Sequence, residues 1–178
     1  MKTLIIYTSQ TGFTKKYAGW IAGRMKADLI ELKDARKKDA AFFDEYQAIA
    51  YGGWAIAGKV AKVKWFLDKA ADWRGKRLAV FCVGASPNES PVIEEALHNM
   101  LSVEQRAYIR AFYCQGGLNY EKMKLPSKLA MKMFASIMKR KKKVTEDEKN
   151  MAEMISASYD ISDFEYIEPI VLYLENEG

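Results

Sequence analysis

Short stretches rich in β-branched and aromatic residues alternate with amphipathic stretches over the first two thirds of the chain. The former predict buried strands, and an apolar repeat every three or four residues predicts helices. We expect strands at Thr3–Thr8, Ala27–Leu32, Gln47–Tyr51, Leu78–Val83 and Ala107–Cys114, and helices at Thr14–Met25, Lys59–Ala71 and Pro91–Leu101. Because this alternation is typical of a parallel sheet with helices on both faces, the sequence predicts an α/β fold with five parallel strands.

The length and composition suit a single domain, residues 1–178, with one large core, since 49% of the residues are apolar. No apolar run approaches the roughly 18 residues that a membrane-spanning helix needs. Fold-like sequence begins too early for a signal peptide, so we expect a cytoplasmic protein. Cys82 and Cys114 lie in predicted strands without Cys-x-x-Cys spacing, which predicts buried reduced thiols.

The turn after the first predicted strand is Ser9-Gln10-Thr11-Gly12-Phe13-Thr14, and it places three hydroxyls and a glycine at the start of a helix. A helix N-terminus presents free N–H groups and a partial positive charge, so it favours an anion. Gly12 permits a positive φ and a close approach of the backbone. An ordinary turn with Thr14 as N-cap would account for one hydroxyl only. The segment lacks the Walker A and Gly-x-Gly-x-x-Gly patterns and predicts a site for one phosphate monoester.

Two further predicted strands end at the same edge of the sheet, where ligands bind in open parallel sheets. The third strand is followed by Gly52, Gly53, Trp54, Ala55, Ile56, Ala57 and Gly58, and the fourth by Gly84, Ala85, Ser86, Pro87 and Asn88. We expect both segments to form one crevice with the phosphate loop. Trp54 is expected to stack on an aromatic ring there, the alternative being a core tryptophan.

A basic insertion spans residues 118–144, with nine bases against a single acid over Leu118–Lys143. From Pro126 on, the apolar residues recur every fourth position, which predicts an amphipathic helix. Its apolar stripe packs on the domain, covers a hydrophobic substrate, or contacts an anionic membrane or an acidic partner through Leu125–Lys143. Nucleic acid is disfavoured as a partner because aromatic residues are not interleaved with the bases.

The C-terminal part is acidic: residues 146–178 carry ten acids and one base. We expect a helix at Glu146–Ser158, followed by an acidic tail, residues 160–178, that either folds back on the basic body or forms an interaction surface. Within the tail, Ile170–Leu174 is expected as a short edge strand or a docked segment.

The sequence offers little for hydrolytic or metal chemistry. The single histidine, His98, lies on a predicted helix, and neither a metal-ligand cluster nor a Gly-x-Ser-x-Gly motif is present. We therefore assign no catalytic side chain and no metal ligand, and expect any redox chemistry to belong to a cofactor.

The pattern Ser9-x-Thr11-Gly12-x-Thr14 after a first strand resembles the phosphate loop of flavodoxins, and the resemblance covers roughly residues 1–117. It implies a flavodoxin-like three-layer sandwich with strand order 2-1-3-4-5 and FMN as cofactor. It further implies that backbone groups around Gly52, Gly53 and Trp54 reach the N5 edge of the flavin, and that residues 84–88 reach its pyrimidine edge.

The segment Gly117-Leu118-Asn119-Tyr120, followed by a helix rich in Met and Lys, resembles the menaquinone-dependent protoporphyrinogen oxidase branch of these proteins. That resemblance implies a dehydrogenase that passes electrons to quinone at a membrane. The leading interpretation is FMN-dependent electron transfer or oxidoreduction with a redox partner protein or a quinone- or porphyrin-type small molecule. A non-catalytic interaction module is the alternative from a different class.

Overall fold

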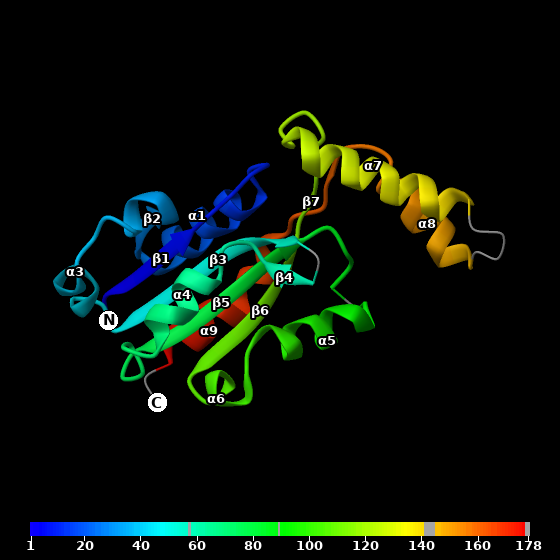
Figure 1. Cartoon of the computed structure of the whole chain (residues 1–178). Helices are drawn as coiled ribbons and strands as arrows, with labels where there is room; N and C mark the ends of the chain where they lie inside the picture. The colour runs from blue at the N-terminus through cyan, green and yellow to red at the C-terminus, as the bar shows by residue number, and fades with distance from the viewer. Residues whose placement is uncertain (57, 89, 141–144, 177–178) are drawn as a thin grey trace.

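The computed structural model describes residues 1–56, 58–88, 90–140 and 145–176. Its centre is a parallel sheet with the strand order β2-β1-β3-β5-β6 (Figure 1). The parallel strands are β1 (Thr3–Tyr7), β2 (Asp28–Glu31), β3 (Ala48–Ile56), β5 (Arg77–Gly84) and β6 (Ile109–Gln115). Counted among the parallel strands alone, this order is the expected 2-1-3-4-5, so the α/β fold is confirmed.

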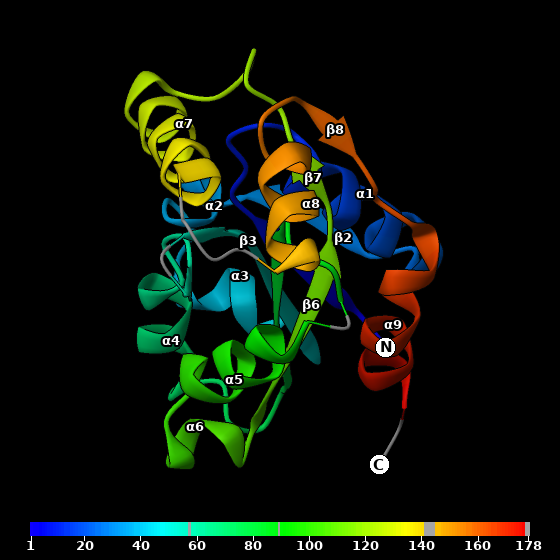
Figure 2. The same ribbon diagram turned by 90° about the vertical axis from the view of Figure 1, so that its right-hand side faces the viewer.

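Helices cover both faces of the sheet and give the three layers seen end-on in Figure 2. One face packs against α1 (Phe13–Met25), the 3₁₀ helix η1 (Phe164–Ile167) and α9 (Glu168–Glu175). The other face packs against α2 (Leu32–Ala35), α3 (Ala40–Asp44), α4 (Lys64–Ala70) and α5 (Pro91–Met100). The short helix α6 (Val103–Arg106), which buries no residue, precedes β6. The sequence analysis missed α2, α3 and α6, which are too short to show a helical repeat.

An excursion leaves the sheet after β6 and returns to it before η1. It is closed by the antiparallel pair β7 (Gly117–Leu118) and β8 (Tyr159–Asp160). Between these strands lie α7 (Leu125–Arg140) and α8 (Glu146–Met154), which extend beyond the carboxyl edge of the sheet (Figure 1). A separate apolar cluster holds the two helices together, so the excursion has a small core of its own.

The third strand is longer than predicted, because it continues through Gly52 and Gly53 to Ile56. It then folds back on β4 (Lys59–Val60), with Ala55 opposite Val60. The predicted helix start at Lys59 is therefore wrong, and α4 begins at Lys64. The physical reason is the tight turn at Gly58, whose φ is 72°, together with the burial of Val60.

The acidic C-terminal segment belongs to the body of the domain. The edge strand expected at Ile170–Leu174 is wrong, because Pro169 sits in the first turn of a helix, α9. Ile170, Val171 and Leu174 are fully buried beneath the sheet. Two partly exposed ion pairs also link the segment to α1. They are Lys16–Asp160 at 2.9 Å and Arg24–Glu168 at 3.9 Å.

Both cysteines are buried and unpaired, as predicted. Burial raises the pKa of the Cys82 thiol to about 12, which keeps it protonated at neutral pH. Within the ranges that the structure describes, no helix combines the length and the apolarity needed to cross a bilayer.

Gly52 tests the packing between β3 and β5. A Cβ atom at this position would lie 2.1 Å from Cζ of Phe81. Gly52→Ala should therefore lower the free energy of unfolding in urea by about 1–3 kcal/mol through overpacking, and Phe81→Leu in the same chain should restore part of it. The control is Gly19→Ala on the exposed side of α1, where nothing lies within 4 Å; it should stabilise by about 0.5–1 kcal/mol. Strictly additive losses in the double variant would contradict the contact.

Candidate cofactor-binding site

An apolar cavity lies at the carboxyl edge of the sheet, beneath the excursion. Its volume is about 460 Å³, within the range of small-molecule sites. Three segments from the sheet side contribute to it: the loop after β1, the end of β3 and the end of β5. The sequence-predicted site residues that line it are Gln10, Thr11, Phe13, Thr14, Trp54, Ala55, Ile56, Gly84, Ala85 and Ser86.

The loop after β1 presents the N-terminus of α1 to this cavity. Gly12 is the N-cap and has a φ of 107°, a conformation that L side chains rarely adopt. No side chain caps the helix. The Ser9 hydroxyl accepts from the N–H of Gly12, the N-cap residue itself, at 3.1 Å, and not from an amide of the first helical turn. The first amides of α1 are thus left for a ligand.

Thr14 lies in the first turn of α1 and carries an unpartnered polar atom. Its side chain is 1% exposed, yet within the described residues its Oγ1 has no hydrogen-bond partner. Leaving a buried hydroxyl unsatisfied costs about 1–3 kcal/mol. Because Gly12 is the N-cap, the alternative of Thr14 as an ordinary cap does not hold. Thr14 lines the cavity, so a ligand whose oxygens reach its hydroxyl would satisfy it.

Backbone carbonyls at the end of β5 are held by two tyrosines. The Tyr113 hydroxyl donates to the Ser86 carbonyl at 2.8 Å, and the Tyr159 hydroxyl donates to the Ala85 carbonyl at 3.0 Å. Burial raises the pKa of both phenols, to about 12 for Tyr159, so they remain donors at neutral pH. The β5 segment is therefore fixed from β6 and from β8.

Pro87 and Asn88, at the far end of that segment, do not line the cavity. The Asn88 N–H donates to Oε1 of Gln115 at 3.0 Å, and the Pro87 carbonyl accepts from the Ser90 N–H. The contact with a pyrimidine edge that the resemblance implies for these two residues stays a prediction.

The third-strand glycines also lie away from the cavity. Gly52 and Gly53 pair with Phe81 and Cys82 of β5, and the Gly52 carbonyl accepts from the Thr8 N–H at 2.9 Å. Gly58 forms the exposed turn to β4, and Ala57 lies outside the described residues. The residues of β3 that border the cavity are Trp54, Ala55 and Ile56. Trp54 is half-buried at this opening, so it lies at the crevice as expected and not in the core.

The roof of the cavity comes from the excursion, and the sequence analysis assigned none of its residues to the site. It consists mostly of methionines and other apolar side chains of the α7–α8 pair: Met123, Ser127, Ala130, Met131, Phe134, Met151, Met154 and Ile155. The apolar repeat of α7 did indicate such a role, since a cover over a hydrophobic substrate was one of the alternatives for this helix. The contribution of α8 was hidden by its acidic composition.

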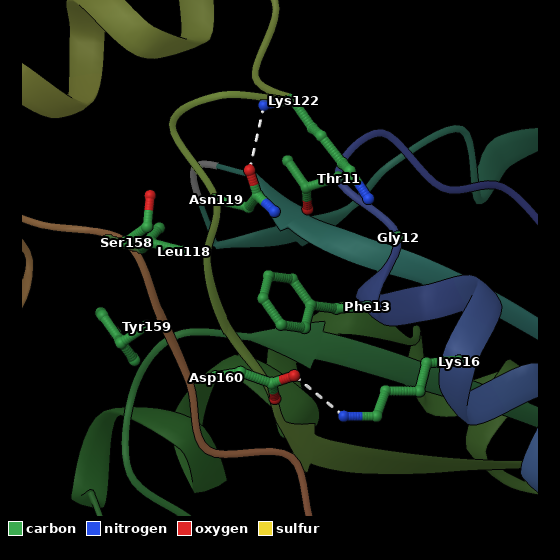
Figure 3. Close-up of a pocket in the computed structure, with 10 residues that line it drawn as sticks. All are labelled: Thr11, Gly12, Phe13, Lys16, Leu118, Asn119, Lys122, Ser158, Tyr159 and Asp160. Atoms are coloured by element: carbon green, nitrogen blue, oxygen red, sulfur yellow. Dashed lines mark hydrogen bonds and ion pairs between the residues drawn. The ribbon is translucent and has the colours of Figure 1, made fainter.

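A second cavity, of about 440 Å³, lies on the outer side of the same loop (Figure 3). It shares Thr11, Phe13 and Leu118 with the first cavity. Two lysines approach it: Lys16, paired with Asp160, and Lys122, whose side chain extends from the excursion toward the loop. Although the loop itself contains no base, positive charge is thus supplied from outside it.

These residues fit FMN, the cofactor that the flavodoxin resemblance implies. An uncapped helix N-terminus, an orphaned buried hydroxyl and nearby lysines suit a phosphate monoester. Trp54 and Ile56 suit the face of an aromatic ring system, and backbone groups at the end of β5 suit its polar edge. Within the described residues, no cluster of His, Cys, Asp or Glu side chains is suited to a metal ion.

One protein family and several solved structures resemble this chain. The family described as "Flavodoxin domain" matches residues 4–146, and a search of curated proteins found no match. Among solved structures, a flavoprotein from Lactobacillus acidophilus NCFM in complex with FMN is 23% identical, with 63% of this chain and 90% of that chain covered and a TM-score of 0.46. A flavodoxin from the domain Archaea is 20% identical, with 88% and 100% covered and a TM-score of 0.44. Because the family match spans most of the sequence, the chain belongs to the flavodoxin domain family.

Proposed function

We propose that this chain binds FMN at the carboxyl edge of the sheet and uses it as an oxidoreductase with an apolar small-molecule substrate. The observation that carries the cofactor assignment is the orphaned Thr14 hydroxyl at an uncapped helix N-terminus. Thr11, Thr14 and the first amides of α1 would hold the phosphate. Trp54, Ile56 and the end of β5 would hold the ring.

FMN, when bound, supplies reversible electron and hydride transfer, and the protein supplies its position and electrostatic surroundings. The half-buried, protonated tyrosines Tyr113 and Tyr159 keep the β5 segment in place beside the ring site. The methionine-lined roof keeps water away from it.

The roof of the cavity bears on the kind of redox partner. An electron carrier that serves another protein needs an accessible flavin edge, whereas here α7 and α8 cover the cavity. Methionine side chains are flexible and polarizable, so they adapt to flat apolar molecules. This favours a quinone- or porphyrin-type substrate, as in the protoporphyrinogen oxidase branch, over a redox partner protein or a non-catalytic module.

Thr14→Val tests the phosphate site. Removing the hydroxyl should weaken FMN binding by about tenfold to a hundredfold, as expected for the loss of a charge-assisted hydrogen bond. Riboflavin, which lacks the phosphate, should bind the variant and the parent chain equally. The melting temperature without ligand should not fall, because the hydroxyl has no partner to lose. Fluorescence titration and thermal melting measure these quantities.

The matched control is Ser162→Ala, since the Ser162 hydroxyl is likewise buried with no hydrogen-bond partner among the described residues, and Ser162 does not line the cavity. It should leave the affinity for FMN unchanged. Equal losses of affinity in both variants, or a Thr14→Val chain that binds FMN normally, would refute the phosphate role.

Ala130→Phe tests the substrate site, because Ala130 lines the roof on α7. In anaerobic stopped-flow experiments on the reduced, FMN-loaded chain, this larger side chain should slow reoxidation by a naphthoquinone at least tenfold. Reoxidation by ferricyanide, which does not need to enter an apolar cavity, should be unchanged. Ala41→Phe, at an exposed position on α3, is the control. If quinone and ferricyanide slow equally, the roof does not select the substrate.

A further inference from the structure

One side of α7 exposes a row of large apolar side chains to solvent. Leu129, Met133 and Ile137 follow one another at every fourth position and are 57%, 64% and 56% exposed. Isolated apolar residues are common on protein surfaces, but a continuous row on one helix indicates an interaction surface.

This apolar row does not belong to the side of α7 that packs in a core of the domain. The opposite side of α7 is already packed, with Ala135 and Met138 buried against Ala152 and Ile155 of the α8 segment. The expectation that the apolar stripe packs on the domain is therefore wrong for Leu129, Met133 and Ile137. It is correct for the side that faces α8.

A cationic row runs directly beside the apolar one. Lys132 and Ser136 each stand one position before a residue of the apolar row, and Lys132, Ser136 and Arg140 likewise recur every fourth position. Lys132, Ser136 and Arg140 also line a hollow of about 380 Å³ between α7 and α8, together with Ser156. Neither cation has an ion-pair partner within the described part of the chain. The hollow offers two cations and the Ser136 hydroxyl to a phosphate, whereas the Ser156 hydroxyl donates to the Ala152 carbonyl.

We propose that α7 docks on an anionic phospholipid bilayer. Leu129, Met133 and Ile137 enter the boundary between headgroups and acyl chains, while Lys132 and Arg140 bind headgroup phosphates in the adjacent hollow. Charge decides between this occupant and a second copy of the chain. Stacking two α7 helices would bring two cationic rows together, because α7 contains no acid. The bases Lys141–Lys143 continue the sequence but lie outside the described residues.

Ala130 and Phe134 form a third row on α7, which connects the exposed apolar row with the cavity. Ala130 and Phe134 lie beside Met133 on the helix and line the cavity roof. Docking would therefore bring the roof of the cavity close to the bilayer, which suits a lipid-soluble substrate. The docking itself does not depend on FMN, so it is tested separately from the proposed function.

The test is co-sedimentation of the full, FMN-loaded chain with vesicles of phosphatidylcholine, with and without phosphatidylglycerol. We expect binding only to the anionic vesicles, weakened by added salt. Met133→Glu with Ile137→Glu should reduce binding at least tenfold. Val103→Glu, at an 80% exposed position on α6, is the matched control and should leave binding unchanged.

A second pair of variants tests the cationic row. Lys132→Gln and Arg140→Gln should each weaken binding about fivefold, whereas Lys69→Gln, at an exposed position on α4, should not. Absence of binding to anionic vesicles overturns the proposal. The proposal is also overturned if replacing Met133 and Ile137 abolishes a dimer seen by light scattering and leaves vesicle binding unchanged. Equal weakening by Lys69→Gln would show that net charge, not this surface, drives the attachment.

Discussion

The left-handed turn at Gly12 is the constraint on which the site depends. With a φ of 107°, this residue ends the loop after β1 and starts α1 with its N-terminus at the carboxyl edge of the sheet. Ser9 turns inward to the Gly12 amide and leaves the helix without a side-chain cap. Thr14 is consequently buried beside the cavity with an unsatisfied hydroxyl. This arrangement costs stability in the free chain, and an anionic ligand at the helix N-terminus would offset that cost.

The excursion adds an apolar cover to the site, which the sheet alone does not provide. The sheet contributes polar backbone and hydroxyl groups, whereas α7 and α8 contribute a methionine-rich roof. The excursion is anchored where β7 pairs with β8, and the Tyr159 hydroxyl links it to Ala85 at the end of β5. In the proposed arrangement, the cofactor site at the sheet, the substrate site under the roof and the bilayer surface on α7 follow one another outward from the sheet.

Local patterns predicted those parts of the fold that depend on local physics. The hydroxyls around Gly12 and the repeat of α7 indicated the phosphate loop and the amphipathic helix directly. The end of β3 was missed because Gly52 looks like a strand terminator, while in the structure its lack of a side chain makes room for the Phe81 ring. Ile170–Leu174 looks like a strand because it is β-branched and apolar, yet Pro169 and burial against the sheet favour a helix. Such outcomes depend on contacts distant in sequence.

The central claim is that the site is built around one phosphate. The most direct measurement is a parallel fluorescence titration of the unaltered chain with FMN and with riboflavin, which differ only in that group. The account predicts that FMN binds at least about tenfold more tightly, because the phosphate alone gains charge-assisted hydrogen bonds from Thr14 and the first amides of α1. Equal affinities for the two flavins would contradict it.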